Sequence, residues 1–405
     1  MSSKIHRIFA ASVAGAALLA ASTVAQAQDV KIGFLGGFTG PIESLVPPIF
    51  EGAKLAIAQI NEQGGVLDGR NIQLLQADST CIDTTAASAA ADRMVNSENV
   101  TALIGPLCSG ETIAAANTVA IPGGVIIISP SATSPALSAL NDNDLVFRTT
   151  PSDAYSGEAL ARLLHGKGHD NIAITYVNND YGKGFADALA GAFEELGGTV
   201  AANEAHEDGK ADYRAEIGSL ASSGADFLVV LAYADGSGQT ILRQALEGGD
   251  FSQFAGGDGM ISNTIVSAVG EGKLDGFIGT KIGNPETPGT SIFADAAKAA
   301  NMDPAGSFVA QSYDAAFLLA LAIQKNGNDG REGLNAALRD VASAPGEVIL
   351  PGEWQKAVEL LAAGQDINYE GASGSHEFDE NGDVPGVVIE TVVEGAGFKD
   401  IGVVK

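Results

Sequence analysis

The feature that most constrains this sequence is an alternation of short apolar segments with amphipathic helical segments. Segments 30–35, 71–78, 100–105 and 125–130 are short and mostly apolar, and helical patterns at 50–60, 84–97 and 111–120 separate them. Strands that are apolar without alternation have both faces covered, and parallel strands joined by helices meet that requirement. This first block therefore predicts a doubly wound α/β unit with a parallel sheet.

A second block repeats the pattern. Strands are expected at 171–177, 198–205, 226–233 and 254–259, with helices at 185–196 and 238–248. The strand at 276–283 and the helices at 291–302 and 307–327 are too little for a third domain, so we expect them to complete the first lobe. The predicted lobes are 28–149 plus 281–373 and 150–280 plus 374–405, joined by three crossings near Thr149, Thr280 and Ser373.

The first 27 residues have the pattern of a secretion signal. Lys4 and Arg7 precede an Ala/Leu/Val-rich stretch, and Ala25-Gln26-Ala27 matches a cleavage site. We expect a mature chain that begins at Gln28, lacks the cysteine needed for a lipid-anchored start, and is located in the periplasm. Removing the signal, which has two basic and no acidic residues, takes the net charge from −28 to −30. Such a surface argues against binding nucleic acid or anionic lipid.

The two cysteines follow expected neighbouring strands. Cys81 comes after 71–78 and Cys108 after 100–105. The carboxyl ends of neighbouring parallel strands lie side by side, so the sulfurs are placed to form a disulfide, worth about 3–4 kcal/mol in the chain-entropy model. A catalytic or redox role for Cys108 is the alternative, but no histidine lies within fifty residues to act as its base.

Hydroxyl side chains follow two strands of the first block. Ser109 begins the helical segment after Cys108, and Ser131 and Thr133 follow the strand at 125–130. Hydroxyls beside the free N–H groups of a helix start can hold a carboxylate or a phosphate. Each residue alone has an ordinary capping role as its alternative, but two such loops at neighbouring strand ends favour an anion site.

The second block has different chemistry at its strand ends. Tyr181, Tyr233 and Asp258 stand at strand ends there. An aspartate beside two tyrosines suits an ammonium group, through a charge-assisted hydrogen bond and a cation–π contact. A turn role is the alternative for Asp258, which glycines flank. The two lobes together predict a cleft for a zwitterion.

Patterns typical of enzymes, cofactor sites and metal sites are weak or absent. The segment 33–40 is glycine-rich but lacks the spacing of a dinucleotide site, and the sequence contains no G-x-S-x-G, P-loop or H-E-x-x-H motif. Asp379 and Asp383 stand at calcium-loop offsets, but the loop lacks its sixth-position glycine, which favours a turn. We therefore expect no enzymatic activity, no cofactor and no metal.

The sequence resembles a known family over nearly the whole mature chain. The resemblance is carried by VKIGFLGGFTGP, GAKLAIAQINEQGGVLDG, QADSTC with IGPLCSG, ISPSATSP, VFRTTPSD, NNDYGKGFADAL, GQTILRQA and FDENGD. These segments are similar to the type I periplasmic substrate-binding proteins of ABC importers, specifically the branched-chain amino acid (Leu/Ile/Val) receptors. The resemblance implies two doubly wound parallel-sheet lobes joined by a three-crossing hinge.

The resemblance also implies a role for each candidate residue. Ser109 and Thr133 would hold the ligand carboxylate, and the carbonyl of Ser131 would help to receive the amino group. Tyr181 and Tyr233 would close over the ligand. The acidic partner of the ammonium group, usually Glu in the family, falls on Asp258, and Leu45 stands near a position that is often aromatic.

The implied function is a receptor that binds a free α-amino acid, branched-chain or otherwise apolar, and delivers it to an inner-membrane ABC permease. We expect the receptor to be a monomer. The alternatives are an amide or an aromatic acid as ligand, and a ligand-sensing role with a separate signalling partner. The sequence does not select the amino acid.

Overall fold

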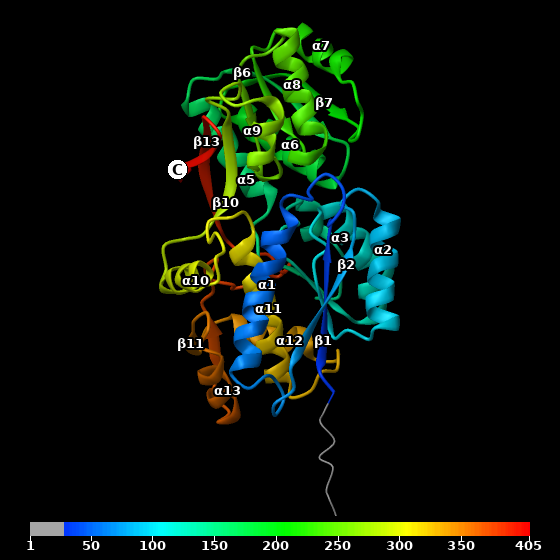
Figure 1. Ribbon diagram of the computed structural model, residues 1–405, viewed down its shortest axis with the longest axis vertical. Coiled ribbons are helices and arrows are strands. Elements are labelled where there is room, and N and C mark those ends of the chain that lie inside the picture. The colour runs from blue at the N-terminus through cyan, green and yellow to red at the C-terminus, as the bar shows by residue number, and fades with distance from the viewer. Residues whose placement is uncertain (1–27) are drawn as a thin grey trace, which may run out of the picture.

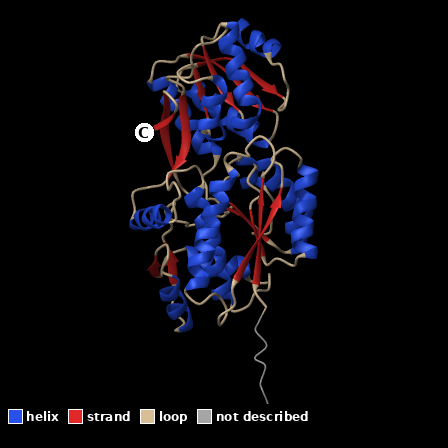
Figure 2. Ribbon diagram, viewed as in Figure 1, coloured by secondary structure: helices blue, strands red, loops and turns tan. Residues whose placement is uncertain are grey.

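The computed structural model describes residues 28–405, and the predicted secretion signal at 1–27 lies outside the described residues. The described chain forms two bodies, one above the other in Figure 1, each built around its own sheet with helices on both faces (Figure 2). We call the body around the five-stranded sheet the first lobe and the body around the seven-stranded sheet the second lobe. Both lobes have the α/β architecture predicted from the sequence.

The first sheet is parallel throughout. It has the order β2-β1-β3-β4-β5 and contains β1 (Val30–Gly36), β2 (Ile72–Asp78), β3 (Ala102–Ile104), β4 (Ile126–Ser129) and β5 (Val146–Arg148). The helices that connect these strands are α1 (Val46–Glu62), α2 (Thr84–Asp92), α3 (Ser109–Ala115) and α4 (Ile121–Gly123). Successive side chains of a strand point to opposite faces. Ile32 and Phe34 accordingly pack with α1, whereas Leu35 belongs to the core under α2 and α3.

The chain returns to the first lobe after the second. The returning elements are α10 (Pro288–Ala299), α11 (Val309–Asn326), α12 (Leu334–Ala342), β11 (Glu347–Ile349), α13 (Trp354–Ala362) and β12 (Ile367–Tyr369). Every residue of α11 from Val309 to Ile323 is buried. A mostly apolar helix that is buried on every side lies inside a protein, and here the buried residues include the polar Gln311, Ser312 and Asp314. It packs closely on α1, because a Cβ at Gly52 would lie 2.4 Å from the carbonyl oxygen of Val309.

The second sheet is mixed. It has the order β14-β13-β10-β9-β8-β6-β7 and contains β6 (Asn171–Val177), β7 (Thr199–His206), β8 (Phe227–Leu231), β9 (Phe254–Gly256), β10 (Ile278–Gly283), β13 (Val387–Glu394) and β14 (Gly397–Val403). Its helices are α5 (Asp153–Gly166), α6 (Asp180–Glu195), α7 (Arg214–Ser222), α8 (Gln239–Gly248) and α9 (Asn263–Val269). The strands from β7 to β10 are parallel, and β13 and β14 add an antiparallel hairpin.

The structure corrects the expectation for strand 276–283. This strand, β10, pairs with β9 and β13 in the second sheet and does not complete the first lobe. It runs through Thr280, so the chain leaves the second sheet only after Gly283. An apolar strand pattern cannot say which of two sheet edges the strand will join. The other two passages between lobes lie between Arg148 and Asp153 and between Tyr369 and Val387.

Between Gln28 and Lys405, the helices all fall short of the combined length and apolar character that a bilayer span requires.

Candidate ligand-binding site

A cavity that is partly open to solvent lies between the lobes, where the strands of both sheets end. Five of the six predicted site residues line it: Ser109, Ser131, Tyr181, Tyr233 and Asp258. The other lining residues are Ile42, Leu45, Ile49, Leu107, Cys108, Gly259 and Phe308. Ligands of open α/β sheets bind outside the carboxyl ends of the strands, and this cavity occupies that position in both lobes.

The sixth predicted residue, Thr133, does not line the cavity. It is 1 % exposed, and its Oγ1 has no hydrogen-bond partner within residues 28–405. Its carbonyl oxygen accepts a hydrogen bond from the backbone N–H of Asp153, at 2.8 Å. Thr133 therefore lies behind the cavity wall, with a free hydroxyl at the junction with α5.

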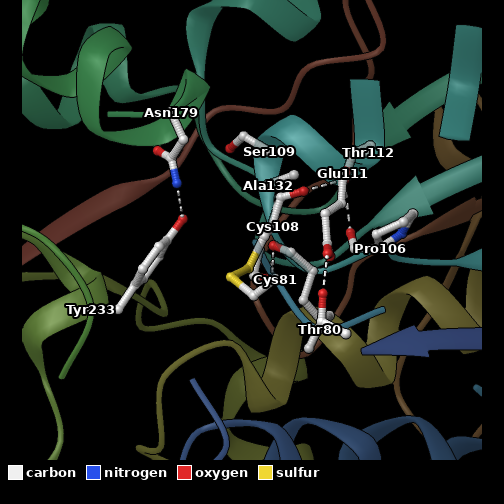
Figure 3. The surroundings of a disulfide bond; sticks show 12 residues. Thr80, Cys81, Pro106, Cys108, Ser109, Glu111, Thr112, Ala132, Asn179 and Tyr233 are labelled. Atoms are coloured by element: carbon white, nitrogen blue, oxygen red, sulfur yellow. Dashed lines mark hydrogen bonds between the residues drawn. A yellow bond between two sulfur atoms is a disulfide. The ribbon is translucent and has the colours of Figure 1, made fainter. Parts of the chain in front are cut away.

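The first-lobe wall is built on the predicted disulfide. Cys81 and Cys108 are bonded, as the sequence predicted, and Figure 3 shows the bridge directly beside Ser109. Cys108 is the last extended residue before α3, so the bridge joins the end of β2 to the start of that helix. The Ser109 hydroxyl oxygen accepts a hydrogen bond from Ser134 N at 3.1 Å, which leaves its proton free to donate into the cavity.

A buried carboxyl group lies in the first turn of the same helix. Glu111 is 1 % exposed, and its Oε1 accepts a hydrogen bond from the Thr80 hydroxyl at 3.3 Å (Figure 3). Its Oε2 has no partner in the part of the chain that the structure describes. Burial raises the pKa of Glu111 to about 8, so the group is largely protonated at neutral pH. A neutral Glu111 keeps negative charge away from the Ser109 end of α3.

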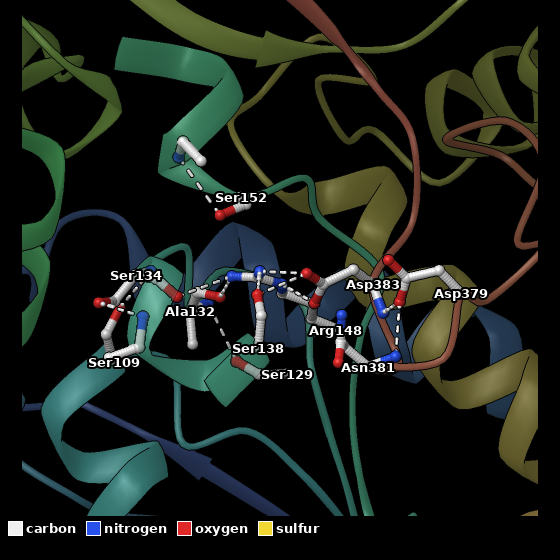
Figure 4. Close-up of polar contacts among 12 residues, drawn as sticks. Ser109, Ser129, Ala132, Ser134, Ser138, Arg148, Ser152, Asp379, Asn381 and Asp383 are labelled. Carbon is white, nitrogen blue, oxygen red and sulfur yellow. Dashed lines mark hydrogen bonds and ion pairs between the residues drawn. The ribbon is translucent and has the colours of Figure 1, made fainter. Parts of the chain in front are cut away.

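An arginine holds the loop that carries Ser131 and Thr133. Arg148, at the end of β5, donates to the carbonyl oxygen of Ser134 at 3.0 Å and to the hydroxyl of Ser138 at 2.9 Å. The same guanidinium pairs with Asp383 (Figure 4). Ser131 is fixed separately, because its hydroxyl donates to the carbonyl oxygen of Leu107 at 2.8 Å.

The second-lobe wall consists of two stacked tyrosines and an aspartate. The rings of Tyr181 and Tyr233 are stacked, with centroids 5.3 Å apart and planes at 20°. Tyr181 donates its hydroxyl proton to Asp258 Oδ1 at 2.8 Å, and Asn179 donates to the hydroxyl oxygen of Tyr233 at 3.1 Å. The backbone N–H of Gly259 also donates to Asp258 Oδ1. Asp258 Oδ2 has no partner among the described residues, so one carboxylate oxygen is available.

A second buried carboxyl group, which sequence reasoning missed, lies near Asp258. Asp153 is the first residue of α5 and is fully buried, and neither of its carboxylate oxygens has a hydrogen-bond partner in the described chain. Burial and the charge of Asp258 both raise the pKa of Asp153 well above its usual value. Burial likewise raises the pKa of Asp258, to about 6. The two carboxyl groups therefore disfavour ionising together, and a cation at Asp258 lessens this repulsion.

The apolar wall was also largely missed. Ile42, Ile49, Leu107 and Phe308 join Leu45 around the cavity. In the sequence these residues look like ordinary core positions of strands and helices. Phe308 has an unusual backbone conformation, left-handed with φ 62°, directly before α11. The residues around it in the sequence do not predict this conformation.

The walls therefore offer a hydroxyl donor on one lobe, the carboxylate of Asp258 on the other, and an apolar surface between them. Two α/β lobes that meet on such a cavity define a two-lobed receptor for a small ligand. The model of the periplasmic binding protein family matches residues 29–358. The chain belongs to this family.

Named relatives agree. The Leu/Ile/Val-binding protein of Escherichia coli (strain K12) is 33 % identical over 307 residues, which cover 75 % of this chain and 82 % of that protein. Among solved structures, a leucine-binding protein from Thermotoga maritima superposes with a TM-score of 0.78 at 25 % identity, covering 93 % of this chain and 99 % of that one. A branched-chain amino acid transporter binding protein from Streptococcus pneumoniae, in complex with isoleucine, has a TM-score of 0.76 at 25 % identity, with the same coverage.

These matches confirm the resemblance that the sequence motifs indicated, including the membership in the branched-chain receptor group. They also confirm the expectation of a binding protein in place of an enzyme, since the relatives given above are named as binding proteins.

Proposed function

We propose that this protein is a periplasmic receptor that encloses a free α-amino acid with an apolar side chain and delivers it to an inner-membrane ABC permease. The observation that carries the proposal is that one wall of the cavity suits a negative group of the ligand and the opposite wall suits a positive group. Ser109 offers a hydroxyl donor from the first lobe, and Asp258 offers a free carboxylate oxygen from the second. A zwitterion satisfies both walls, whereas a simple acid leaves Asp258 unpaired.

In this proposal, the ligand carboxylate is held by Ser109 and Thr133, and the ammonium group by Asp258 and the carbonyl oxygen of Ser131. Thr133 does not line the cavity and is 1 % exposed, so its assignment requires the loop 131–134 to move toward the ligand on binding. Tyr181 orients Asp258 through its hydrogen bond, and Tyr233 covers the ligand. Asp153 interacts with Asp258 through charge but does not line the cavity.

The apolar wall supports a branched-chain or similar side chain. Ile42 and Leu45 from one segment and Phe308 from another give surfaces that a hydrocarbon side chain can contact without leaving a polar group unpaired. The E. coli relative is named for leucine, isoleucine and valine, and the S. pneumoniae structure holds isoleucine. Leucine is therefore the first ligand to test.

Secretion through a cleaved signal at residues 1–27, delivery to the permease and a monomeric state belong to the same proposal. Size-exclusion chromatography with light scattering on the mature chain tests the last of these. A mass of one chain with and without leucine is expected, and a stable dimer would contradict the proposal.

The experiment that tests the ligand assignment is calorimetry with leucine and with its deaminated analogue, 4-methylpentanoate. The wild type should bind leucine and bind the analogue far more weakly. The Asp258→Ala variant should lose about 1–3 kcal/mol of leucine affinity, or more because a charge is left unpaired, with no corresponding loss for the analogue. Equal losses for both compounds would remove the ammonium role of Asp258.

A thermal-shift screen of all amino acids, amides and aromatic acids tests the wider alternatives. A ligand that binds only the folded form raises the melting temperature. A shift with benzoate or an amide and none with any amino acid would replace the proposed ligand class.

A further inference from the structure

A segment of the first lobe that forms part of the cavity wall is bonded to the second lobe away from the cavity. The segment 40–45 joins β1 to α1 and carries the wall residues Ile42 and Leu45. The backbone N–H of Ser44 donates to Asp235 Oδ2 at 2.9 Å. In return, the backbone N–H of Asp235 donates to the carbonyl oxygen of Pro41 at 3.2 Å. The two bonds bracket Ile42.

The second lobe holds Asp235 in place for these contacts. Its other carboxylate oxygen, Oδ1, accepts a hydrogen bond from the hydroxyl of Thr264 at 2.8 Å. The hydroxyls of Ser44 and Ser262 share a further hydrogen bond across the lobes, at 3.0 Å. Asp235 follows the cavity residue Tyr233 by two positions, so one short segment supplies both a cavity wall and a bond to the opposite lobe.

The surfaces also fit closely at this point. A Cβ at Gly236 would lie 2.7 Å from Cβ of Pro41 and 2.5 Å from Asp208 Oδ1. A glycine therefore lets the segment after Tyr233 approach Pro41 closely enough for the Asp235 bonds to form.

From these contacts we infer that Asp235 is a clamp residue. It positions the segment 40–45 when the lobes close, and it sets how long the ligand stays bound without touching the ligand. The bonds from Asp235 to Pro41 and Ser44 join the two lobes, so they must break before the lobes can separate and release the ligand. The bond from Ser44 N ends on a carboxylate, and such charge-assisted bonds are stronger than neutral ones. This inference rests on the proposed amino acid receptor function.

The clamp predicts an effect on dissociation and not on association. Removing a hydrogen bond to a charged group corresponds to roughly a ten- to hundred-fold change in an equilibrium constant. Because the bonds form only on closure, we expect the change in the dissociation rate constant for leucine. The association rate constant, which reflects entry into the open protein, should stay within about three-fold.

The test is stopped-flow kinetics with leucine on the full mature chain. Asp235→Ala should dissociate roughly ten- to hundred-fold faster than wild type, and Asp235→Asn should recover most of the loss because its amide oxygen still accepts from Ser44 N. The matched control is Glu247→Ala, which removes one exposed carboxylate of the same lobe that pairs only with Arg214. Dissociation from Asp235→Ala no faster than from Glu247→Ala would overturn the inference.

A second variant removes a contact from the opposite lobe. Ser44→Ala keeps the backbone bond to Asp235 and loses only the bond to Ser262, so at most a few-fold faster dissociation is expected. A larger increase than in Asp235→Ala would assign the clamp to the Ser44–Ser262 bond and overturn the role of Asp235. If Asp235 had a purely structural role, its removal would lower the Tm of the ligand-free protein. We expect instead that the ligand-free Asp235→Ala and Glu247→Ala proteins have similar Tm values. If the wild type binds no amino acid, the proposed function fails. The same kinetics with any ligand that the thermal-shift screen finds then still test the clamp, because equal dissociation rate constants for Asp235→Ala and Glu247→Ala would overturn it.

Discussion

Arg148 and Asp383 form a two-point ion pair that connects the first passage between the lobes with the third. Arg148 Nε donates to Asp383 Oδ1 at 2.6 Å, and Nη2 donates to Oδ2 at 2.7 Å. Arg148 ends β5, and Asp383 belongs to the chain between β12 and β13. The same guanidinium also holds the loop of Ser131 and Thr133 through the carbonyl oxygen of Ser134. The chain passages between the lobes and the proposed carboxylate site therefore share one buried cation (Figure 4).

Removing the acidic partner should be costly. Arg148 is 1 % exposed, so Asp383→Asn leaves a buried guanidinium without its counter-charge. Breaking one partner of a buried pair typically costs about 3–5 kcal/mol. Urea unfolding of the ligand-free protein should show a loss of this size. Glu380→Gln, an exposed neighbour in the same segment, is the control and should unfold as wild type does; equal stability of both variants would contradict a structural role for the pair.

Leucine affinity should fall on the acid side. The pKa of Asp258 in the ligand-free protein is raised to about 6 by burial, so its carboxylate gains a proton as the pH falls through that value. A neutral Asp258 cannot pair with the ammonium group, and affinity should be near its full value above pH 7 and decrease below pH 6. Calorimetry from pH 5 to pH 8 measures this. In Asp258→Asn the leucine affinity should be low over the whole range and should not change with pH. If the affinity of that variant still decreased below pH 6, the decrease would be due to the titration of another group.

Stability should decrease as the pH rises through the range set by Glu111. In the unfolded chain this carboxyl group ionises near 4.5, whereas burial raises its pKa in the folded protein to about 8. The contribution is therefore fully present below about pH 4.5, is lost as the pH rises to about 8, and is constant above that. Glu111→Gln stays neutral at every pH. Urea unfolding measures the unfolding free energies of the variant and the wild type. From pH 4.5 to pH 8 the variant should become more stable relative to the wild type. A difference that does not change with pH would show that Glu111 is not buried as a neutral group.

The fold was predictable because its strongest signals are local. Apolar strands without alternation specify a sheet covered on both faces, and β1, β6 and β8 lie close to where the sequence placed them. The disulfide of Cys81 and Cys108 was predicted because both cysteines follow strands of one parallel sheet, although β2 and β3 flank β1 and are not neighbours as the sequence suggested. The sheet to which β10 belongs was not predictable, because that choice depends on long-range pairing with β9 and β13.

The site was predictable only where a residue type is unusual for its position. Ser109 and Asp258 stand at strand ends with chemistry that a core would avoid, and both line the cavity. Asp153 follows the capping residue Ser152, so in the sequence it looks like an acidic residue in the first turn of a helix, where carboxylates are common. Nothing local indicates that the tertiary fold buries it beside a second carboxylate.

Asp153 should therefore be a residue whose removal stabilises the protein and impairs binding. Both of its oxygens lack partners in the described chain, and burial with the charge of Asp258 raises its pKa well above the usual value. A buried carboxyl group without hydrogen bonds opposes folding, and a site kept for ligand binding carries such a cost. Asp153→Asn should raise the Tm of the ligand-free protein and lower its affinity for leucine. Glu158→Gln makes the same charge change at an exposed position of α5 and should alter neither quantity. A variant that binds leucine as tightly as wild type would show that the ammonium group interacts with Asp258 alone. A lower Tm would mean that Asp153 has a stabilising partner in the folded protein.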